Sequence, residues 1–379
     1  MARDRDGREL NLLVQHPRSR IGRRGFLRVG ALLGAAGLAG CTAERACKVQ
    51  PGAVNRVPEQ LLSIYNWSDY IDDRSIPAFQ AHSGIRVSYD VYSSNDDLLA
   101  KMKSGRSQFD IIVPTNWFIP TYRRLGLIEP LPRELIPNLR NLDRAFVDTD
   151  YDPGNQYTVP WQWGTTGIGY NTAKVPGGKV DSWKALFDPA PQLSGHVSLL
   201  REASELINCA LIYLGKNPNS TADADLAEVV SLIRSLKGRV SKFSSDTYID
   251  ELAKNQTWIA HGWSGDVFQA AERNRDIAYA IPKEGSLRWA DVMCIPKGAP
   301  HPRNAALFMN YVLQPTVNSR ISRYVSYGTP VTLAKALLPD EQLQDPTIYP
   351  PASVKLSVIT PSGEKLQKWQ AAYSSIIKA

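Results

Sequence analysis

The chain has 379 residues, which exceeds the usual size of a domain with one hydrophobic core, so two lobes are expected. Hydrophobic residues make up 43% and charged residues 21%, a composition that is typical of a soluble globular protein and excludes disorder for most of the chain. The formal net charge is +7, but residues 1–40 hold eight arginines against three acidic residues, so the remainder carries only about +2. Because no continuous basic stripe remains outside this leader, we expect no nucleic-acid partner.

The first 40 residues have the pattern of a secretory signal peptide. They are polar and basic as far as Arg24, and an apolar run of 11 residues follows from Val29 to Ala39. A membrane-spanning helix needs about 20 apolar residues, whereas the core of a signal peptide needs about 7 to 15. We therefore interpret residues 1–40 as a cleaved leader and expect the protein to be exported.

Two short motifs in the leader indicate an export route and a lipid anchor. Residues 22–27 (GRRGFL) resemble the twin-arginine export signal, and residues 38–41 (LAGC) resemble a bacterial lipobox. The second resemblance implies that Cys41 is acylated and tethers the mature protein to the membrane of the cell envelope, with a periplasmic location. A chance Gly-Cys pair after an ordinary leader is the alternative. Residues 41–58 are interpreted as a flexible tether.

The sequence patterns of common enzymes and metal sites are missing. Residues 262–266 (GWSGD) differ from the nucleophile elbow of hydrolases at the last position, and no glycine-rich loop has nucleotide-binding spacing. Beyond Cys41 the cysteines and histidines stand singly and far apart. They are Cys47, Cys209, Cys294, His82, His196, His261 and His301. This spacing gives neither a disulfide framework nor a metal-binding pair. We expect Cys209 and Cys294 to be small core residues, and we expect no catalysis, no cofactor and no metal.

Beyond the tether, short apolar runs alternate with helical stretches. This alternation predicts parallel α/β layers. A first series comprises residues 61–65, 76–82, 85–91, 96–103 and 110–113, and a second comprises residues 196–200, 203–214, 224–236, 258–263, 266–273 and 277–281. Gly84 is placed to end one helix, and Ser94 or Asn95 to cap the next. No stretch of the mature sequence is long and apolar enough for a second membrane anchor.

Five short motifs occur in one order along the mature chain. They are residues 65–70 (YNWSDY), 109–115 (FDIIVPT), 263–266 (WSGD), 281–285 (IPKEG) and 349–352 (YPPA). Together they resemble the polyamine-binding proteins of bacterial ABC importers, the spermidine and putrescine receptors, over residues of about 60 to 355. The resemblance implies an α/β, two-lobed periplasmic-binding-protein fold with a hinge and a ligand cleft between the lobes. It implies a first lobe of residues 59–166 and 291–335 and a second lobe of residues 167–290 and 336–379.

A polyamine requires a particular kind of site, whatever the family. Its ammonium charges are separated by methylene groups, so carboxylates must meet the charges and apolar or aromatic walls must cover the methylenes. Tryptophan and tyrosine do both, because they also offer a cation–π face worth about 0.5 to 2 kcal/mol. Uncharged solutes are rejected, since they leave the buried acids without a partner.

The resemblance, carried over position by position, implies a set of ligand-binding residues. These are Trp67, Ser68, Asp69, Tyr70, Thr115, Glu205, Trp263, Asp266, Trp289, Asp291 and Tyr327. The roles of Trp117, Glu202 and the C-terminal segment stay open. Arg201 departs from the family pattern and could pair with Glu202.

Most of these residues also have a purely structural interpretation. Asp266 followed by Gln269 fits a capping box, and Glu205 in a first helical turn suits the helix dipole. Asp291 has no such role, because it stands between Trp289 and the apolar run 292–295. When each residue is considered alone, a structural role is favoured for Asp69, Thr115, Trp117 and Glu202. Contact with the ligand is favoured for Trp67, Trp263, Asp266, Asp291 and Tyr327.

The sequence therefore predicts a monomeric, membrane-tethered receptor, not an enzyme, that captures putrescine or spermidine by lobe closure and delivers it to the permease subunits of an ABC importer. Three alternatives stay open. The same fold could bind an amino acid derivative, a sugar or an anion; the protein could be an exported enzyme of unrecognised type; or it could be a sensor for a signalling partner. An anion receptor should bring arginine into the cleft, and Arg201 is the only candidate.

Overall fold

The computed structural model describes residues 60–105, 108–360 and 363–378. The expected leader, the lipidation site Cys41 and the tether at 41–58 lie outside these residues. Among the helices of the described ranges, none has the length and apolarity that crossing a bilayer requires.

The first sheet has three parallel strands in the order β2-β1-β3. Strand β1 (Leu61–Trp67) lies between β2 (Arg86–Tyr92) and β3 (Ile111–Ile112). The connections between them carry α1 (Ser75–Ser83) and α2 (Asn95–Lys103). This confirms the parallel α/β layers predicted for the first series of elements.

Two local signals at the ends of α1 and α2 act as the sequence predicts. Gly84 ends α1 with φ of +73°, a left-handed conformation that costs glycine little, and its N–H donates to the carbonyl of Gln80. Ser94, rather than Asn95, caps α2: its side chain accepts a hydrogen bond from the N–H of Asp97.

The second sheet has seven strands in the order β12-β10-β5-β8-β6-β7, with β9 also paired to β5. Its strands are β5 (Val159–Asn171), β6 (Val197–Leu199), β7 (Val240–Phe243), β8 (Ile259–Trp263), β9 (Ile277–Ala280), β10 (Ser286–Met293) and β12 (Leu356–Ser357). The expectation of parallel pairing is wrong for its centre. Strand β5 pairs antiparallel with β8, β9 and β10, whereas β6 pairs parallel with β7 and β8.

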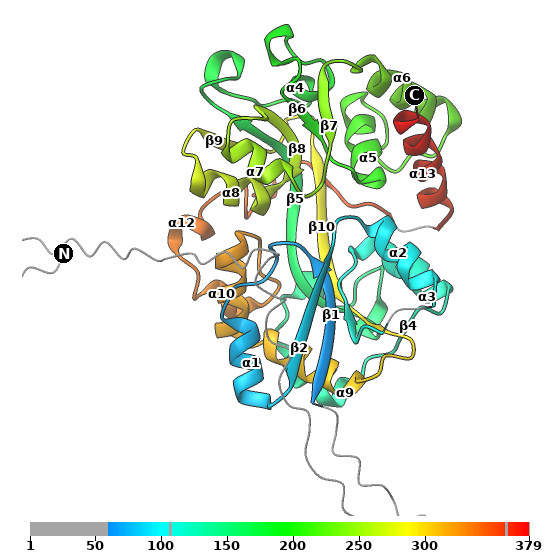
Figure 1. The fold of residues 1–379 in the computed structure, drawn as a ribbon, viewed down its shortest axis with the longest axis vertical. Helices are drawn as coiled ribbons and strands as arrows, with labels where there is room; N and C mark the ends of the chain where they lie inside the picture. Colours follow the sequence, from blue (N-terminus) through cyan, green and yellow to red (C-terminus); the bar gives the residue numbers. More distant parts are fainter. Residues whose placement is uncertain (1–59, 106–107, 361–362, 379) are drawn as a thin grey trace, which may run out of the picture. The chain divides into compact units, whose positions relative to one another are not determined.

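The paired strands β5 and β10 link the two groups of elements. Figure 1 shows them side by side, running from the group with β1 and β2 to the group with α5 to α8. Their register shifts between Asp291 and Val292, which is a β-bulge or a similar irregularity. Such irregularities re-aim side chains, and this one lies beside the cavity described below.

The remaining elements cover these sheets. The helices are α3 (Ile119–Arg124), α4 (Lys184–Phe187), α5 (Ala203–Tyr213), α6 (Asp223–Ser235), α7 (Tyr248–Ala253), α8 (Ser264–Arg273), α9 (Pro302–Val312), α10 (Pro315–Val325), α11 (Thr332–Lys335), α12 (Asp340–Leu343) and α13 (Gly363–Ile377). Short 3-10 turns lie at Asn116–Phe118, Arg133–Leu135, Pro137–Asn141, Arg144–Phe146, Pro153–Asn155, Pro176–Gly178 and Pro191–Leu193, and β4 (Ile128–Glu129) pairs with β11 (Ile295–Pro296). Helix α13 packs on α5 and α6, where the Trp369 indole N–H donates to the carbonyl of Ser220 at 2.9 Å.

Both cysteines of the described ranges lie in the core. Cys209 and Cys294 are free thiols and fully buried, as the sequence predicts. The largest fully buried side chains include Trp117, Trp161 and Trp183. A core of this size fixes the strand ends and helix starts that build the cavity.

Candidate functional site

One cavity brings together side chains from elements far apart in the sequence. Its lining residues are Trp67, Ser68, Tyr70, Tyr92, Ser93, Asn95, Thr115, Glu202, Glu205, Ser245, Trp263, Asp266, Trp289, Asp291 and Tyr327. They come from the ends of β1, β2 and β8, from β10, from the starts of α2, α5 and α8, and from connecting segments that carry Ser68, Tyr70, Ser93, Thr115, Ser245 and Tyr327. Ten of the eleven residues that the sequence suggested as ligand contacts are among them.

Aromatic rings form much of the cavity wall. The Trp67 and Trp263 rings meet edge to face with centroids 5.7 Å apart, and Trp67 also packs on Tyr92. The Tyr327 ring meets Trp289 at 5.1 Å and Tyr70 at 5.3 Å. Because these pairs hold one another in place, the wall is pre-formed for an apolar or cationic group.

Asp291 projects from β10 at the register shift. Its Oδ1 accepts a hydrogen bond of 2.7 Å from the Thr115 hydroxyl, and Thr115 is held in turn by the Asn95 side-chain amide at 2.9 Å. Asp291 is 5% exposed. Burial raises the pKa of its carboxyl group to about 7, and the bond from Thr115 offsets this only in part.

Asp266 is the third residue of α8. Its two oxygens accept hydrogen bonds from the hydroxyls of Tyr327 at 2.7 Å and Tyr248 at 2.9 Å. Its side chain does not cap α8, so the alternative of a capping box with Gln269 is not what the structure shows. Burial raises the pKa of Asp266 to about 6.

Glu205 is the third residue of α5. The Thr166 hydroxyl donates to Oε2 at 2.6 Å, and the Trp263 indole N–H donates to Oε1 at 3.3 Å. Burial raises the pKa of Glu205 to about 7, although both hydrogen bonds lower it. Trp263 is therefore both a wall of the cavity and a hydrogen-bond donor to one of its acids.

Glu202, whose role the sequence left open, is 1% exposed and lines the cavity. Its Oε2 accepts a hydrogen bond from the N–H of Asn95 at 3.1 Å, which joins the start of α5 to the start of α2. Burial, with Asp96 nearby, raises the pKa of Glu202 well above its ordinary value. The suggested pairing of Glu202 with Arg201 is absent between these two described residues, and Arg201 is exposed.

The ionisable groups that carry charge in the lining are all acidic. Four carboxyl groups, from Glu202, Glu205, Asp266 and Asp291, face the cavity, and no lysine or arginine occurs among its lining residues as far as the described chain extends. Their hydrogen-bond donors in the structure are hydroxyl, indole and amide groups. Neutral donors cannot compensate the burial of several negative charges, so these carboxylates require a cationic ligand when ionised.

Two residues discussed from sequence lie away from the cavity. Asp69 is exposed in a turn with φ of +51°, and it does not line the cavity, although its charge contributes to the raised pKa of Asp266. The exposed-turn interpretation therefore describes its position, and we leave Asp69 out of the candidate site. Trp117 is buried in the core at 1% exposure and does not line the cavity.

Sequence reasoning missed four of the lining residues: Tyr92, Ser93, Asn95 and Ser245. Asn95 positions Thr115 through two hydrogen bonds, of 2.9 and 3.0 Å. Residues 92–95 lie at the junction of β2 and α2, and loops at the carboxyl ends of parallel strands are where ligand sites gather. That placement was the signal available in the sequence.

Glycines next to the aromatic wall allow its close packing. A Cβ atom at Gly164 would lie 2.8 Å from the Trp289 ring and 2.9 Å from the Tyr327 ring. A Cβ atom at Gly265 would lie 2.6 Å from the Tyr327 ring. The glycine in the Trp-Ser-Gly-Asp motif is therefore explained by packing against Tyr327.

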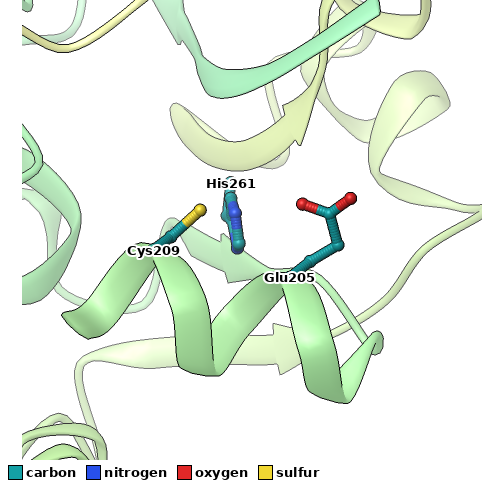
Figure 2. A group of neighbouring side chains, drawn as sticks. All are labelled: Glu205, Cys209 and His261. Atoms are coloured by element: carbon teal, nitrogen blue, oxygen red, sulfur yellow. The ribbon is translucent and has the colours of Figure 1, made fainter. Parts of the chain in front are cut away.

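Glu205 also belongs to a second group of polar side chains. Glu205, Cys209 and His261 hold potential metal-ligating atoms within 4.8 Å of one another (Figure 2). The spacing of the histidines in the sequence indicated no such group, and only the fold brings His261 next to Cys209 and Glu205. The fold joins residues 52 positions apart, which no spacing rule detects.

Comparison with known proteins identifies the family of this chain. The sequence matches the family of bacterial extracellular solute-binding proteins over residues 75–351. The chain is similar to the putrescine-binding periplasmic protein PotF of Escherichia coli strain K12, with 36% identity over 319 residues that cover 80% of this chain and 86% of that protein. It is also similar to the spermidine/putrescine-binding periplasmic protein of the same strain, with 30% identity over 292 residues, 77% of this chain and 83% of that protein.

Solved structures show the same fold. A putative spermidine/putrescine ABC transporter from Listeria monocytogenes superposes with a TM-score of 0.79 at 33% identity, covering 84% of this chain and 99% of the other. The expected α/β class with two lobes of the periplasmic-binding-protein type is thereby confirmed.

Proposed function

The chain belongs to the bacterial extracellular solute-binding proteins, and we propose that its solute is a polyamine of the putrescine or spermidine type, delivered to an ABC importer. The proposal rests on one observation: four carboxyl groups, three of them buried and that of Asp266 partly exposed, and six aromatic rings surround a cavity with no basic side chain among its described lining residues.

The physical fit follows from the chemistry of both partners. An ammonium group next to Asp291 or Asp266 would balance the negative charge of the ionised carboxylate, which the neutral hydrogen-bond donors leave uncompensated. The rings of Trp67, Trp263 and Trp289 cover methylene groups, and each face adds about 0.5 to 2 kcal/mol toward a cation. The names of the relatives, putrescine-binding and spermidine/putrescine-binding proteins, support the same class of ligand.

We propose that the ligand closes two lobes, the first comprising residues 59–166 and 291–335 and the second residues 167–290 and 336–379. With these bounds, Trp67 belongs to the first lobe and Trp263 to the second, and their rings are in contact. The hydrogen bond from Asn95 to Glu202 also joins the two lobes. The ligand would stabilise this arrangement through contacts from both sides.

An anion receptor on the same fold finds no support in the cavity. The candidate arginine, Arg201, is exposed and is not a lining residue. Four acidic groups facing the same space would repel an anion.

The ligand class is tested by thermal unfolding of the purified protein with a panel of solutes. We expect putrescine and spermidine to raise the unfolding temperature, because ligand at 100 times its dissociation constant stabilises the native state by about 2.7 kcal/mol. Amino acids, sugars and inorganic phosphate at the same concentration should leave it unchanged. Stabilisation by one of these control solutes and not by the amines would contradict the proposal.

Anchoring and delivery are proposed with the ligand class. The resemblance of residues 38–41 to a lipobox supports an acylated Cys41 that holds the protein at the membrane of the periplasm, and we propose that the protein is a monomer. Cys41→Ser is expected to move the protein from the membrane fraction to the soluble periplasmic fraction, and an unchanged membrane fraction would argue against the anchor. Stimulation of the importer's ATPase activity by the loaded protein distinguishes delivery from a sensor role.

A further inference from the structure

Glu205, which lines the cavity, forms a compact mixed donor group with two side chains that do not line it. Glu205 and Cys209 stand four residues apart on α5, so they lie on the same face of the helix. His261 comes from β8, two residues before Trp263. The ligating atoms of the three lie within 4.8 Å of one another, and Figure 2 shows the His261 ring between the other two side chains.

His261 is the unusual member of this group. It is 0% exposed, and neither ring nitrogen has a hydrogen-bond partner in the part of the chain that the structure describes. Its ring packs edge to face against Trp183 with centroids 5.4 Å apart. Burial lowers the pKa of His261 to about 3, so the imidazole is neutral at physiological pH and keeps a free lone pair.

We propose that Glu205, Cys209 and His261 bind a divalent transition-metal ion of the zinc type. Carboxylate, thiolate and imidazole are the donors that zinc takes in proteins. Two of the three become anionic in the complex, so they balance the charge of a divalent ion in a place where a net charge is poorly tolerated. The third, His261, gains the partner that it otherwise lacks.

The geometry needs only a small adjustment. Zinc bonds of about 2.0 to 2.3 Å place the ligands of a tetrahedral shell about 3.3 to 3.8 Å apart, so atoms as far as 4.8 Å apart must approach by about 1 to 1.5 Å. The thiol of Cys209 must lose its proton to the solvent as the metal–sulfur bond forms, which makes binding weaker at low pH. Of the three, Glu205 lines the cavity, and the ion would enter there.

Sharing Glu205 couples the metal to the amine. A carboxylate that ligates a cation has less charge to offer an ammonium group, so zinc and putrescine should weaken each other's binding by the same factor. This coupling rests on the proposed function, whereas metal binding itself does not. Cys209 and His261 are not lining residues, so variants at these positions separate the two activities.

The test is titration of the purified full chain with Co²⁺ and Zn²⁺. We expect Co²⁺ to produce a thiolate-to-cobalt charge-transfer band, with displacement of Co²⁺ by Zn²⁺ at one ion per chain. In Cys209→Ala the band should disappear and zinc affinity should fall at least tenfold. Cys294→Ala is the matched control, because Cys294 is also a buried free thiol but belongs to a different part of the core. It should leave the band unchanged.

A second variant tests whether His261 is a metal ligand or an ordinary core histidine. His261→Phe keeps a ring in the same apolar site and removes the unpaired nitrogens, so the metal-free protein should unfold at the same temperature as the wild type or higher. Its unfolding temperature should no longer rise with Zn²⁺. The inference is overturned if Cys209→Ala or His261→Phe binds Co²⁺ and Zn²⁺ as the wild type does. Retained putrescine binding by Cys209→Ala shows that loss of metal is not loss of the proposed function.

Discussion

Replacing Asp291 by asparagine is expected to weaken putrescine binding by about 100-fold or more and to leave the fold intact. Asp291 is buried at the register shift of β10, where its carboxyl group accepts a hydrogen bond from the neutral hydroxyl of Thr115. Removing one partner of a buried ion pair costs about 3 to 5 kcal/mol, and 1.4 kcal/mol corresponds to a tenfold change in affinity. Isothermal titration calorimetry with putrescine measures the loss directly.

The fold of this variant should be unharmed because the acid does not stabilise the empty protein at neutral pH. Burial raises the pKa of Asp291, so ionisation there costs free energy, and the isosteric amide removes that cost. Asp69→Asn is the matched control. It removes an acid that is exposed and does not line the cavity, and asparagine tolerates its φ of +51°. Equal losses of affinity in the two variants would remove Asp291 from the site.

The sequence predicted those parts of the fold that depend on local signals. Gly84 and Ser94 end and begin helices where their chemistry predicts. The antiparallel centre of the second sheet escaped prediction, because the partners of β5 come from residues 259–263, 277–280 and 286–293. Alternation of strands and helices indicates an α/β protein, but it does not fix strand direction once a chain crosses between lobes.

The site was predicted mainly through its motifs, and the gaps have physical causes. Asp69 sits between Ser68 and Tyr70, so its motif position resembled theirs, but the turn directs it to solvent. Asn95 was expected only as a cap, because its contact with Thr115 joins two loops. His261 was dismissed on spacing alone, since its neighbours on α5 become visible only after folding.

Putrescine affinity is expected to fall by about 100-fold between pH 8 and pH 6. In the empty protein the pKa values of Glu205 and Asp291 are raised to about 7, and that of Asp266 to about 6. The amines stay protonated throughout, since their pKa is near 10. Each carboxyl group with a pKa of about 7 that must ionise for binding therefore weakens affinity about tenfold at pH 6.

The stability of the empty protein should change in the opposite direction. A carboxyl group whose pKa is raised on folding stabilises the folded state fully below its unfolded pKa, near 4, and this contribution disappears as the pH rises through the folded value. The contributions of Glu205, Asp266 and Asp291 are thus lost between about pH 4 and pH 7.

Thermal unfolding with and without putrescine across pH 5 to 8 separates the two effects. The ligand-induced rise in unfolding temperature should be largest at pH 8 and should shrink as the acids take up protons. Calorimetry in buffers of different ionisation enthalpy should detect proton release on binding near pH 6.5, and Asp291→Asn should release fewer protons. An affinity independent of pH, with no proton release, would mean that the acids of the cavity do not change their protonation state when the ligand binds, and the pH dependence expected from their raised pKa values would then be wrong.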